Sequence, residues 1–224
     1  MLTVVSTSKM KSSNLYKEKF KKYGKDPKSL LWKNRGAAHQ RFRQFWAEID
    51  FNNKSVLDIG CGFGEFGNFL LKRYQGVNYT GVDNVNEFIE VAKKEVPDGK
   101  FKSLDYNVLD GEYQVVVASG VLNSNTGLRL GEVSDPEGSR LENLEFRKKA
   151  IKKMFSLTEE VLAFNMLGGH PFPENEPTSN IYYSDSLEIL EYCMTLTRRV
   201  ILRHHYNPKD FTLFMYKTRE GVNG

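Results

Sequence analysis

Short apolar runs alternate with amphipathic segments from residue 55 to residue 217. The runs are rich in valine, isoleucine, leucine and aromatic residues, a composition that predicts buried strands. The segments between them carry apolar residues three and four positions apart, which predicts helices that bury one face. The strand candidates are Ser55–Ile59, Tyr79–Val82, Lys100–Leu104, Gln114–Ala118, Glu160–Met166, Arg199–His205 and Thr212–Lys217, and the helix candidates are Glu65–Tyr74, Asn86–Glu95, Leu141–Phe155 and Asp185–Thr195.

The order of these segments predicts the fold class. Alternating strands and helices are typical of a parallel sheet with helices on both faces. The last two strand candidates are joined only by a short turn around Pro208, which predicts an antiparallel hairpin. We therefore predict an α/β fold with a seven-stranded, mostly parallel sheet that ends in an antiparallel C-terminal hairpin strand. The last helix candidate begins as a capping box, with Asp185 followed three residues later by Glu188.

The N-terminal part of the chain has a different pattern. Residues 14–51 show helical spacing that is interrupted near Gly24–Pro27, with Phe42, Phe45 and Trp46 on one helical face. We predict two parts, a basic N-terminal arm with capping helices at residues 1–51 and an α/β domain at residues 52–219.

Charge is concentrated in this arm. The chain has 32 Lys and Arg against 28 Asp and Glu, a net charge of +4, whereas residues 1–50 alone carry 12 Lys and Arg against four Asp and Glu. Such an arm can bind a polyanion such as a nucleic acid, or it can be a solvated helical face. The aromatic residues interleaved with the lysines favour an arm that packs on the domain.

Composition excludes several classes of protein. No stretch approaches the ~20 apolar residues that a membrane span needs, and the apolar patch at the start is too short for a secretory signal. We therefore expect a cytoplasmic protein with no membrane partner. Cys61 and Cys193 lie in different local contexts, which favours reduced thiols over a disulfide framework. No cysteine and histidine spacing resembles a zinc site, so no metal is expected.

A glycine-rich loop follows the first strand candidate, with glycines at positions 60, 62, 64 and 67. Such a loop lets a ligand lie against bare backbone beside helix N–H groups. The spacing also fits the dinucleotide fingerprint, with Asp83 about 20 residues further on. Asp58 separates the two interpretations, because a carboxylate there would repel a pyrophosphate and attract a cation. A cationic ligand is therefore favoured.

Four segments resemble successive motifs of the class I S-adenosylmethionine-dependent methyltransferases over about residues 54–218. They are VLDIGCGFG, the acid in YTGVDN, the acid in FKSLDY, and QVVVASGVLN. The resemblance implies that the glycine loop holds the amino-acid end of S-adenosylmethionine, that the second acid binds the ribose hydroxyls and that the third meets the adenine amine. Carboxylates accept such hydrogen bonds. The implied donor site comprises Asp58, Gly60, Cys61, Gly62, Asp83, Asn84, Asp105, Tyr106, Ser119 and Gly120.

Each of these residues also has a simpler interpretation. Asp83 could cap the helix that follows it, Asp105 could be an ordinary turn residue, and Cys61 is expected to pack as a small side chain rather than act as a nucleophile. The helix around residues 34–46 could cap the donor through Gln40 or Arg41, or could simply pack its aromatic face inward.

The acceptor is expected beyond the carboxyl ends of the later strands, where open α/β sheets bind ligands. An oxygen or nitrogen nucleophile can need a base, and histidine suits that role near neutral pH. His170, His204 and His205 follow the fifth and sixth strand candidates and are the catalytic candidates, although a histidine at a strand end is more often structural.

The chain is therefore predicted to be an enzyme that methylates an oxygen or nitrogen of a small molecule, such as a metabolite, surface sugar or natural-product intermediate, and leaves S-adenosylhomocysteine. Amino-methylating DNA enzymes carry an Asp/Asn-Pro-Pro-aromatic motif after the fourth strand. This chain has Ser119-Gly120-Val121-Leu122 there, and the absence of the motif makes a nucleic-acid acceptor less favoured. Two alternatives stay open. One is an RNA or protein methyltransferase that uses the basic arm, and the other is a non-catalytic donor-binding partner subunit.

Overall fold

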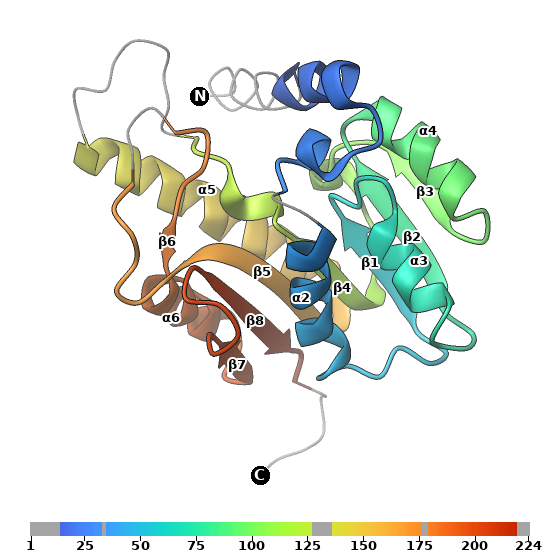
Figure 1. Ribbon diagram of the computed structural model, residues 1–224. Helices are drawn as coiled ribbons and strands as arrows, with labels where there is room; N and C mark the ends of the chain where they lie inside the picture. Colours follow the sequence, from blue (N-terminus) through green and yellow to red (C-terminus); the bar gives the residue numbers. More distant parts are fainter. Residues whose placement is uncertain (1–13, 33–34, 127–135, 176–178, 219–224) are drawn as a thin grey trace. The chain divides into compact units, whose positions relative to one another are not determined.

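The computed structural model describes residues 14–32, 35–126, 136–175 and 179–218. The chain divides into two compact units, residues 1–109 and residues 110–224 (Figure 1). Within the described ranges, no helix has an apolar stretch of the length that a bilayer crossing requires. The predicted division into an N-terminal arm at residues 1–51 and an α/β domain at residues 52–219 stays a prediction.

The first unit contains three parallel strands in the order β3-β2-β1. Strand β1 (Ser55–Ile59) pairs with β2 (Asn78–Asp83), and β2 pairs with β3 (Lys100–Ser103). Helix α3 (Glu65–Leu71) packs on β2, and α4 (Asn86–Glu95) packs on β2 and β3. The parallel register brings the carboxyl ends of the three strands to one edge of the sheet.

The N-terminal arm is helical and interrupted where the sequence predicted. Residues 14–23 form a helix, η1 (Pro27–Leu30) follows as a short 3-10 turn, and α2 (Arg35–Trp46) comes next. The hydroxyl of Ser29, which is fully buried, donates to the carbonyl of Gly24 over 2.7 Å and thereby fixes η1 to the preceding helix.

Helix α2 is attached by its aromatic face. Phe42 and Phe45 contact Phe66 on α3, with ring centroids 5.0 and 5.6 Å apart. Arg41 and Gln40 both make interactions of their own, and Arg41 is only 8% exposed. A role for either residue in binding the donor stays a prediction.

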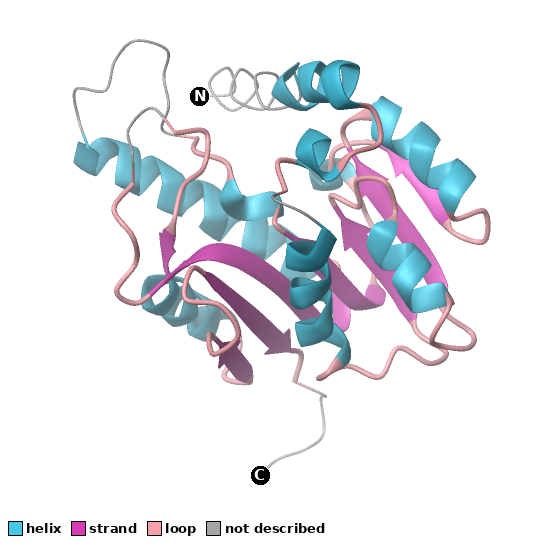
Figure 2. Cartoon of the chain, in the orientation of Figure 1, coloured by secondary structure: helices cyan, strands magenta, loops and turns pink. Residues whose placement is uncertain are grey.

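The second unit is built around β5 (Thr158–Gly169), the long curved strand in Figure 2. Strand β4 (Tyr113–Ser119) pairs with it in parallel, β8 (Asp210–Tyr216) pairs with it antiparallel, and β7 (Val200–Arg203) pairs antiparallel with β8. The order is β4-β5-β8-β7. The predicted C-terminal hairpin is therefore confirmed, as is the mostly parallel α/β class.

The remaining elements of this unit are η3 (Val121–Asn123), α5 (Pro136–Ser156) and α6 (Ser186–Leu196). Helix α5 packs against β5, and α6 packs against β5, β7 and β8. Helix α5 begins five residues earlier than the Leu141 predicted from apolar spacing.

Two sequence predictions are corrected here. The two-residue strand β6 (Ser184–Asp185) pairs with Gly168 and Gly169, so the described strands number eight rather than seven. A strand of this length has no apolar periodicity to reveal it. The capping box is also incomplete. Asp185 caps α6 by accepting from the N–H of Leu187, but Glu188 turns away and forms an ion pair with Arg140 over 2.7 Å.

We predict that Gly67→Ala destabilises the protein. A Cβ added at Gly67 would lie 2.6 Å from the ring of Tyr79, which is 1% exposed and has no room to move. Overpacking of this kind costs about 1–3 kcal/mol, more than the helix propensity that alanine adds. Urea unfolding measures the loss, with the half-buried Asn68→Ala on the same helix as the control. Equal stability of the two variants would contradict the predicted clash.

Candidate active site

The glycine loop turns the chain from β1 into α3 by hydrogen bonds to the neighbouring strand. The N–H groups of Gly60 and Cys61 both donate to the carbonyl of Val82, over 2.8 and 3.1 Å. Gly62 has a φ of +53°, a conformation that other residues rarely adopt. The loop therefore lies against the end of β2, and the absence of a side chain at Gly62 lets Leu30 pack on the loop.

Asp83 connects the glycine loop to the loop that follows β2. Its carboxylate accepts from the N–H of Gly62 over 3.1 Å and from the N–H of Val85 over 2.9 Å. Burial raises the pKa of Asp83 to about 6, although hydrogen bonds from the N–H groups of Val85, Gly62 and Asn84 oppose the rise. The acid expected to bind ribose is thus placed directly beside the glycine loop.

The third predicted acid lies at the same edge of the sheet. Asp105 follows β3 and caps η2 (Tyr106–Val108) by accepting from the N–H of Asn107 over 2.9 Å. The N–H of Leu104 donates to the carbonyl of Asp83 over 3.0 Å, so the loops after β2 and β3 are also connected. The first unit therefore brings together Gly60, Cys61, Gly62, Asp83, Asn84, Asp105 and Tyr106.

Asp58 lies beneath the loop, where it is 3% exposed. The Tyr79 hydroxyl donates to its carboxylate over 2.6 Å. Burial raises the pKa of Asp58 to about 7, the hydrogen bond from Tyr79 lowers it, and the charge of Asp83 raises it further. Direct contact between Asp58 and a bound donor stays a prediction.

Cys61 is a buried packing residue. Its sulfur would lie 2.9 Å from a Cβ at Gly81, and the side chain is 8% exposed. Burial raises the pKa of the thiol well above its ordinary value, so the thiolate that a nucleophile needs is disfavoured. The described residues contain no group of three histidines, cysteines or acids that could hold a metal ion.

Ser119 and Gly120 belong to the second unit, at the carboxyl end of β4. Gly120 has a φ of +76° and begins η3. The Ser119 hydroxyl is buried and has no hydrogen-bond partner within the described part of the chain. Contact of these two residues with the donor stays a prediction.

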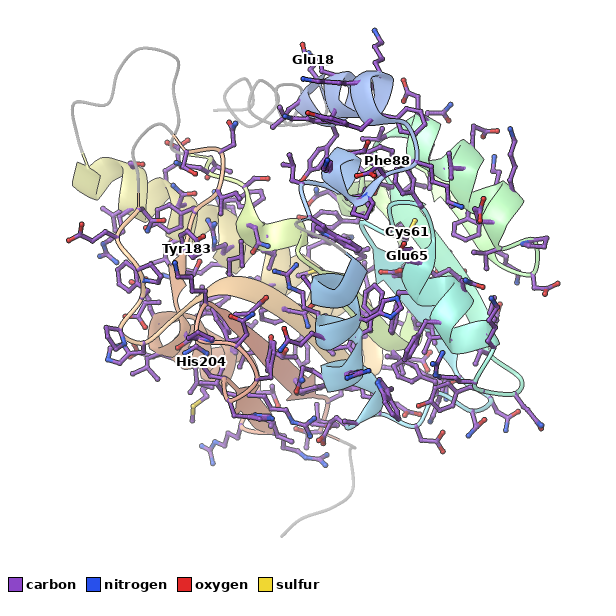
Figure 3. All side chains as sticks on the ribbon, in the orientation of Figure 1. Glu18, Cys61, Glu65, Phe88, Tyr183 and His204 are labelled. Atoms are coloured by element: carbon purple, nitrogen blue, oxygen red, sulfur yellow. The ribbon has the colours of Figure 1, made fainter. Side chains whose placement is uncertain are left out.

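The three candidate histidines have different surroundings in the second unit. Nδ1 of His170 lies 3.2 Å from both carboxylate oxygens of Asp185, and its side chain is 53% exposed. His204, labelled in Figure 3, donates from Nδ1 to the carbonyl of Asp210 over 3.0 Å. Its ring lies against Gly169. His205 is exposed. Of the three, His170 has the geometry of a base, because a carboxylate holds one ring nitrogen and leaves Nε2 available.

Sequence reasoning missed a buried arginine in this unit. Arg147 on α5 is 1% exposed and donates to Oδ1 of Asn143 over 3.0 Å and to the carbonyl of Ser124 over 3.3 Å. Its guanidinium lies 4.8 Å from the ring centroid of Tyr182, and burial lowers its pKa to about 10. Asn143 in turn accepts from the N–H of Thr126. This network fixes the segment that follows β4, but in sequence Arg147 is indistinguishable from the solvated lysines around it.

Comparison with known proteins agrees with this geometry. A family model described as a methyltransferase domain matches residues 31–126. A Mycobacterium tuberculosis protein provisionally named a methyltransferase is 26% identical over 168 residues, which cover 73% of this chain and 93% of that protein. The trans-aconitate 2-methyltransferase of Delftia acidovorans is 35% identical over 52 residues, which cover 23% of this chain and 19% of that enzyme.

Solved structures share the fold. The magnesium protoporphyrin IX methyltransferase of Synechocystis, solved with bound S-adenosylmethionine, has a TM-score of 0.57 and 17% identity, and the match covers 81% of each chain. A plantazolicin methyltransferase solved with S-adenosylhomocysteine has a TM-score of 0.58 and 14% identity, with coverage of 83% of this chain and 85% of that one. The chain is therefore similar to methyltransferases, and its fold is that of the class I S-adenosylmethionine-dependent methyltransferases. The Synechocystis enzyme has been solved with S-adenosylmethionine and with S-adenosylhomocysteine, the donor and product that the sequence predicts for this chain.

We predict that the donor-free protein loses stability as the pH rises from about 4 to 7. Asp58 has a higher pKa in the folded chain than in the unfolded chain, about 7 against 3.8, so the folded state binds its proton more tightly. The free energy of unfolding then falls across this window, by on the order of 4 kcal/mol for this group. Asp58→Asn should flatten the profile in urea unfolding at pH 5 and pH 8. The exposed Asp98→Asn is the control, and an unchanged profile in Asp58→Asn would contradict the prediction.

Proposed function

We propose that the protein transfers the methyl group of S-adenosylmethionine to an oxygen or nitrogen of a small molecule, with His170 as the general base. The observation that carries this proposal is the His170–Asp185 pair at the carboxyl end of β5. Open α/β sheets bind ligands beyond this end of their strands.

The first unit fits the donor. A carboxylate at Asp83 can accept from the two ribose hydroxyls, and the glycine loop offers bare backbone to the amino-acid end. Asp58 is a buried acid with a raised pKa, so a sulfonium nearby stabilises its ionised form. These residues suit a cationic ligand, which is the kind of ligand that the sequence predicted.

The chemistry needs little from the protein beyond positioning and proton removal. Bound S-adenosylmethionine supplies a sulfonium methyl group whose C–S bond breaks, with both electrons going to sulfur, as the acceptor's lone pair bonds to carbon. Nε2 of His170 accepts the proton that the acceptor oxygen or nitrogen loses. Asp185 keeps the ring oriented and stabilises the imidazolium that results.

Two observations support a small acceptor over a nucleic acid. The aromatic residues of the basic arm are used in packing on the first unit, and some of its lysines lie over the ring of Tyr23. Trans-aconitate and magnesium protoporphyrin IX, which appear in the names of similar proteins, are small molecules. A ribosomal RNA methyltransferase of Aliivibrio fischeri also matches, over only 20% of its length.

We predict that donor affinity weakens as the pH falls below about 6. Protonated Asp83, whose pKa is about 6, cannot accept from both ribose hydroxyls, so affinity should drop about tenfold per pH unit below that value. Calorimetric titration with S-adenosylmethionine between pH 5 and 7 measures this. Asp83→Asn should bind weakly at every pH and show a shallower slope, because only Asp58 then titrates in this range, whereas Asp98→Asn should follow the wild type. The full wild-type slope in Asp83→Asn would assign the pH dependence to another group.

We predict that His170→Gln lowers turnover by about 10²–10⁴-fold without changing donor affinity, because it removes the base and leaves the first unit intact. Methyl transfer is followed with isotope-labelled donor and a deproteinised metabolite extract. Asp185→Asn keeps the helix cap, since asparagine caps as well as aspartate. It loses the charge that supports the imidazolium, so its turnover should fall, but less than that of His170→Gln.

The matched control for these variants is His205→Gln, which should turn over like the wild type. Full activity in His170→Gln would remove His170 from the mechanism. Label recovered in RNA or protein instead of small molecules, with affinity that falls steeply with salt, would support the alternative acceptor classes.

A further inference from the structure

Arg147 is a buried cation with no carboxylate partner in the described part of the chain. Its side chain is 1% exposed, and burial lowers its pKa to about 10. The guanidinium contacts the ring of Tyr182 and uncharged oxygens of Asn143 and Ser124. These contacts stabilise a guanidinium but leave its charge unneutralised. Because a buried charge is costly unless it is paired, the surroundings of Arg147 favour an anion.

The five N–H groups of this guanidinium are used unequally. Nη1 donates to the carbonyl and to Oδ1 of Asn143, over 2.8 and 3.0 Å, so both of its N–H groups have acceptors. Nη2 donates to the carbonyl of Ser124 over 3.3 Å, which is longer than usual for such a bond. Nε is buried and has no acceptor among the described residues. The edge formed by Nε and Nη2 therefore has donors to spare.

This edge has the geometry that binds a carboxylate. Nε and Nη2 are adjacent donors in one plane, and the two oxygens of a planar carboxylate accept from such a pair side by side. The other polar atoms that contact the guanidinium are the oxygens of Asn143 and Ser124, which accept hydrogen bonds and do not donate them. The further oxygens of a phosphate would meet these like partial charges, so a carboxylate fits better than a phosphate.

Arg147 lies at the same end of the second unit's sheet as the proposed base. Ser124, to which it donates, follows the carboxyl end of β4, His170 follows the carboxyl end of β5, and the two strands are parallel. Tyr182, which contacts the guanidinium, comes three residues before Asp185, the partner of His170. The same short segment therefore contributes to the surroundings of both Arg147 and His170.

The segments next to Arg147 are joined by isolated contacts. Ser124 forms an isolated bridge with Ile181, and the N–H of Asn125 donates to the carbonyl of Asn180 over 2.9 Å. Contacts of this kind open at a lower free energy than the continuous ladder between β4 and β5. Local opening of these segments gives a ligand access to the buried guanidinium.

We propose that Arg147 binds a carboxylate of the acceptor through Nε and Nη2. A carboxylate held in this way has its oxygens engaged in hydrogen bonds, so the oxygen or nitrogen that is methylated is a second group of the same molecule. The acceptor is then a hydroxy or amino carboxylic acid. The inference rests on the proposed function for the identity of this ligand, but binding of a carboxylate to Arg147 needs neither the methyl donor nor turnover.

Nuclear magnetic resonance of the full-length protein with isotope-labelled arginine tests the site directly. Succinate, added at constant ionic strength, should shift the Nε–H resonance of Arg147 and slow its exchange with water, whereas the uncharged succinamide should not. Arg147→Lys assigns the resonance. Arg140, an exposed arginine on the same helix that pairs with Glu188, is the internal control and should not respond. A resonance that succinate leaves unchanged, or that responds only to inorganic phosphate, would overturn the proposal.

Turnover provides a second test. A deproteinised metabolite extract is separated by anion exchange, and the retained fraction should hold the acceptor. Arg147→Lys keeps the charge but loses the fork, so it should need about 10–100-fold more of this fraction for its half-maximal rate. Its affinity for S-adenosylhomocysteine should be unchanged, Arg140→Lys should behave like the wild type, and thermal unfolding shows whether each variant is folded.

The two tests separate this inference from the proposed function. Methyl transfer only to molecules of the unretained fraction would overturn the carboxylate site and leave the methyltransferase activity established. Succinate binding at Arg147 without methyl transfer to any fraction would support the site and contradict the proposed function.

Discussion

The hydrogen bond between the Gly62 N–H and the Asp83 carboxylate holds the first unit's functional edge together. It joins two loops that are 21 residues apart in sequence, and the N–H of Leu104 adds the third loop through the Asp83 carbonyl. A buried carboxylate is stable only when N–H groups compensate its lost hydration. The same carboxylate that orders the loops is therefore the one proposed to bind the ribose hydroxyls.

The two buried acids at this edge favour a cationic ligand. Asp58 and Asp83 are both buried, and the charge of Asp83 raises the pKa of Asp58. Two like charges in one region destabilise each other, and a positive ligand relieves both. A pyrophosphate would add a third negative charge. The glycine spacing alone fits either ligand, so the buried acid under the loop, and not the glycines, decides which one the unit is built for.

Much of the fold followed from sequence because its signals are local. The bounds of β1 and α4 agree with the predicted ones to the residue, since each has strong periodicity and clear breakers. The edge with Gly60, Asp83 and Asp105 was also predicted, because the ends of parallel strands meet at one edge. What sequence could not provide were contacts between distant segments. The proximity of Leu30 to Gly62, the Asp185 partner of His170 and the burial of Arg147 depend on packing that no local pattern encodes.

The ranking of the three histidines shows why acceptor chemistry is harder to predict than donor chemistry. Each histidine follows a strand, so its position in the sequence does not show which of the three is the better base. Only the group that faces each ring nitrogen distinguishes them. Position alone also fails to predict a polar row on adjacent strands, formed by the register partners Ser119, Asn165 and Thr212. Asn165 donates to Thr212, and this fixes which way its amide points. The proposed donor site thus uses backbone turns and acids at strand ends, whereas the proposed base is a side chain whose orientation is set by a neighbour elsewhere in the chain. A change in one such neighbour can alter the acceptor while the donor site is left intact.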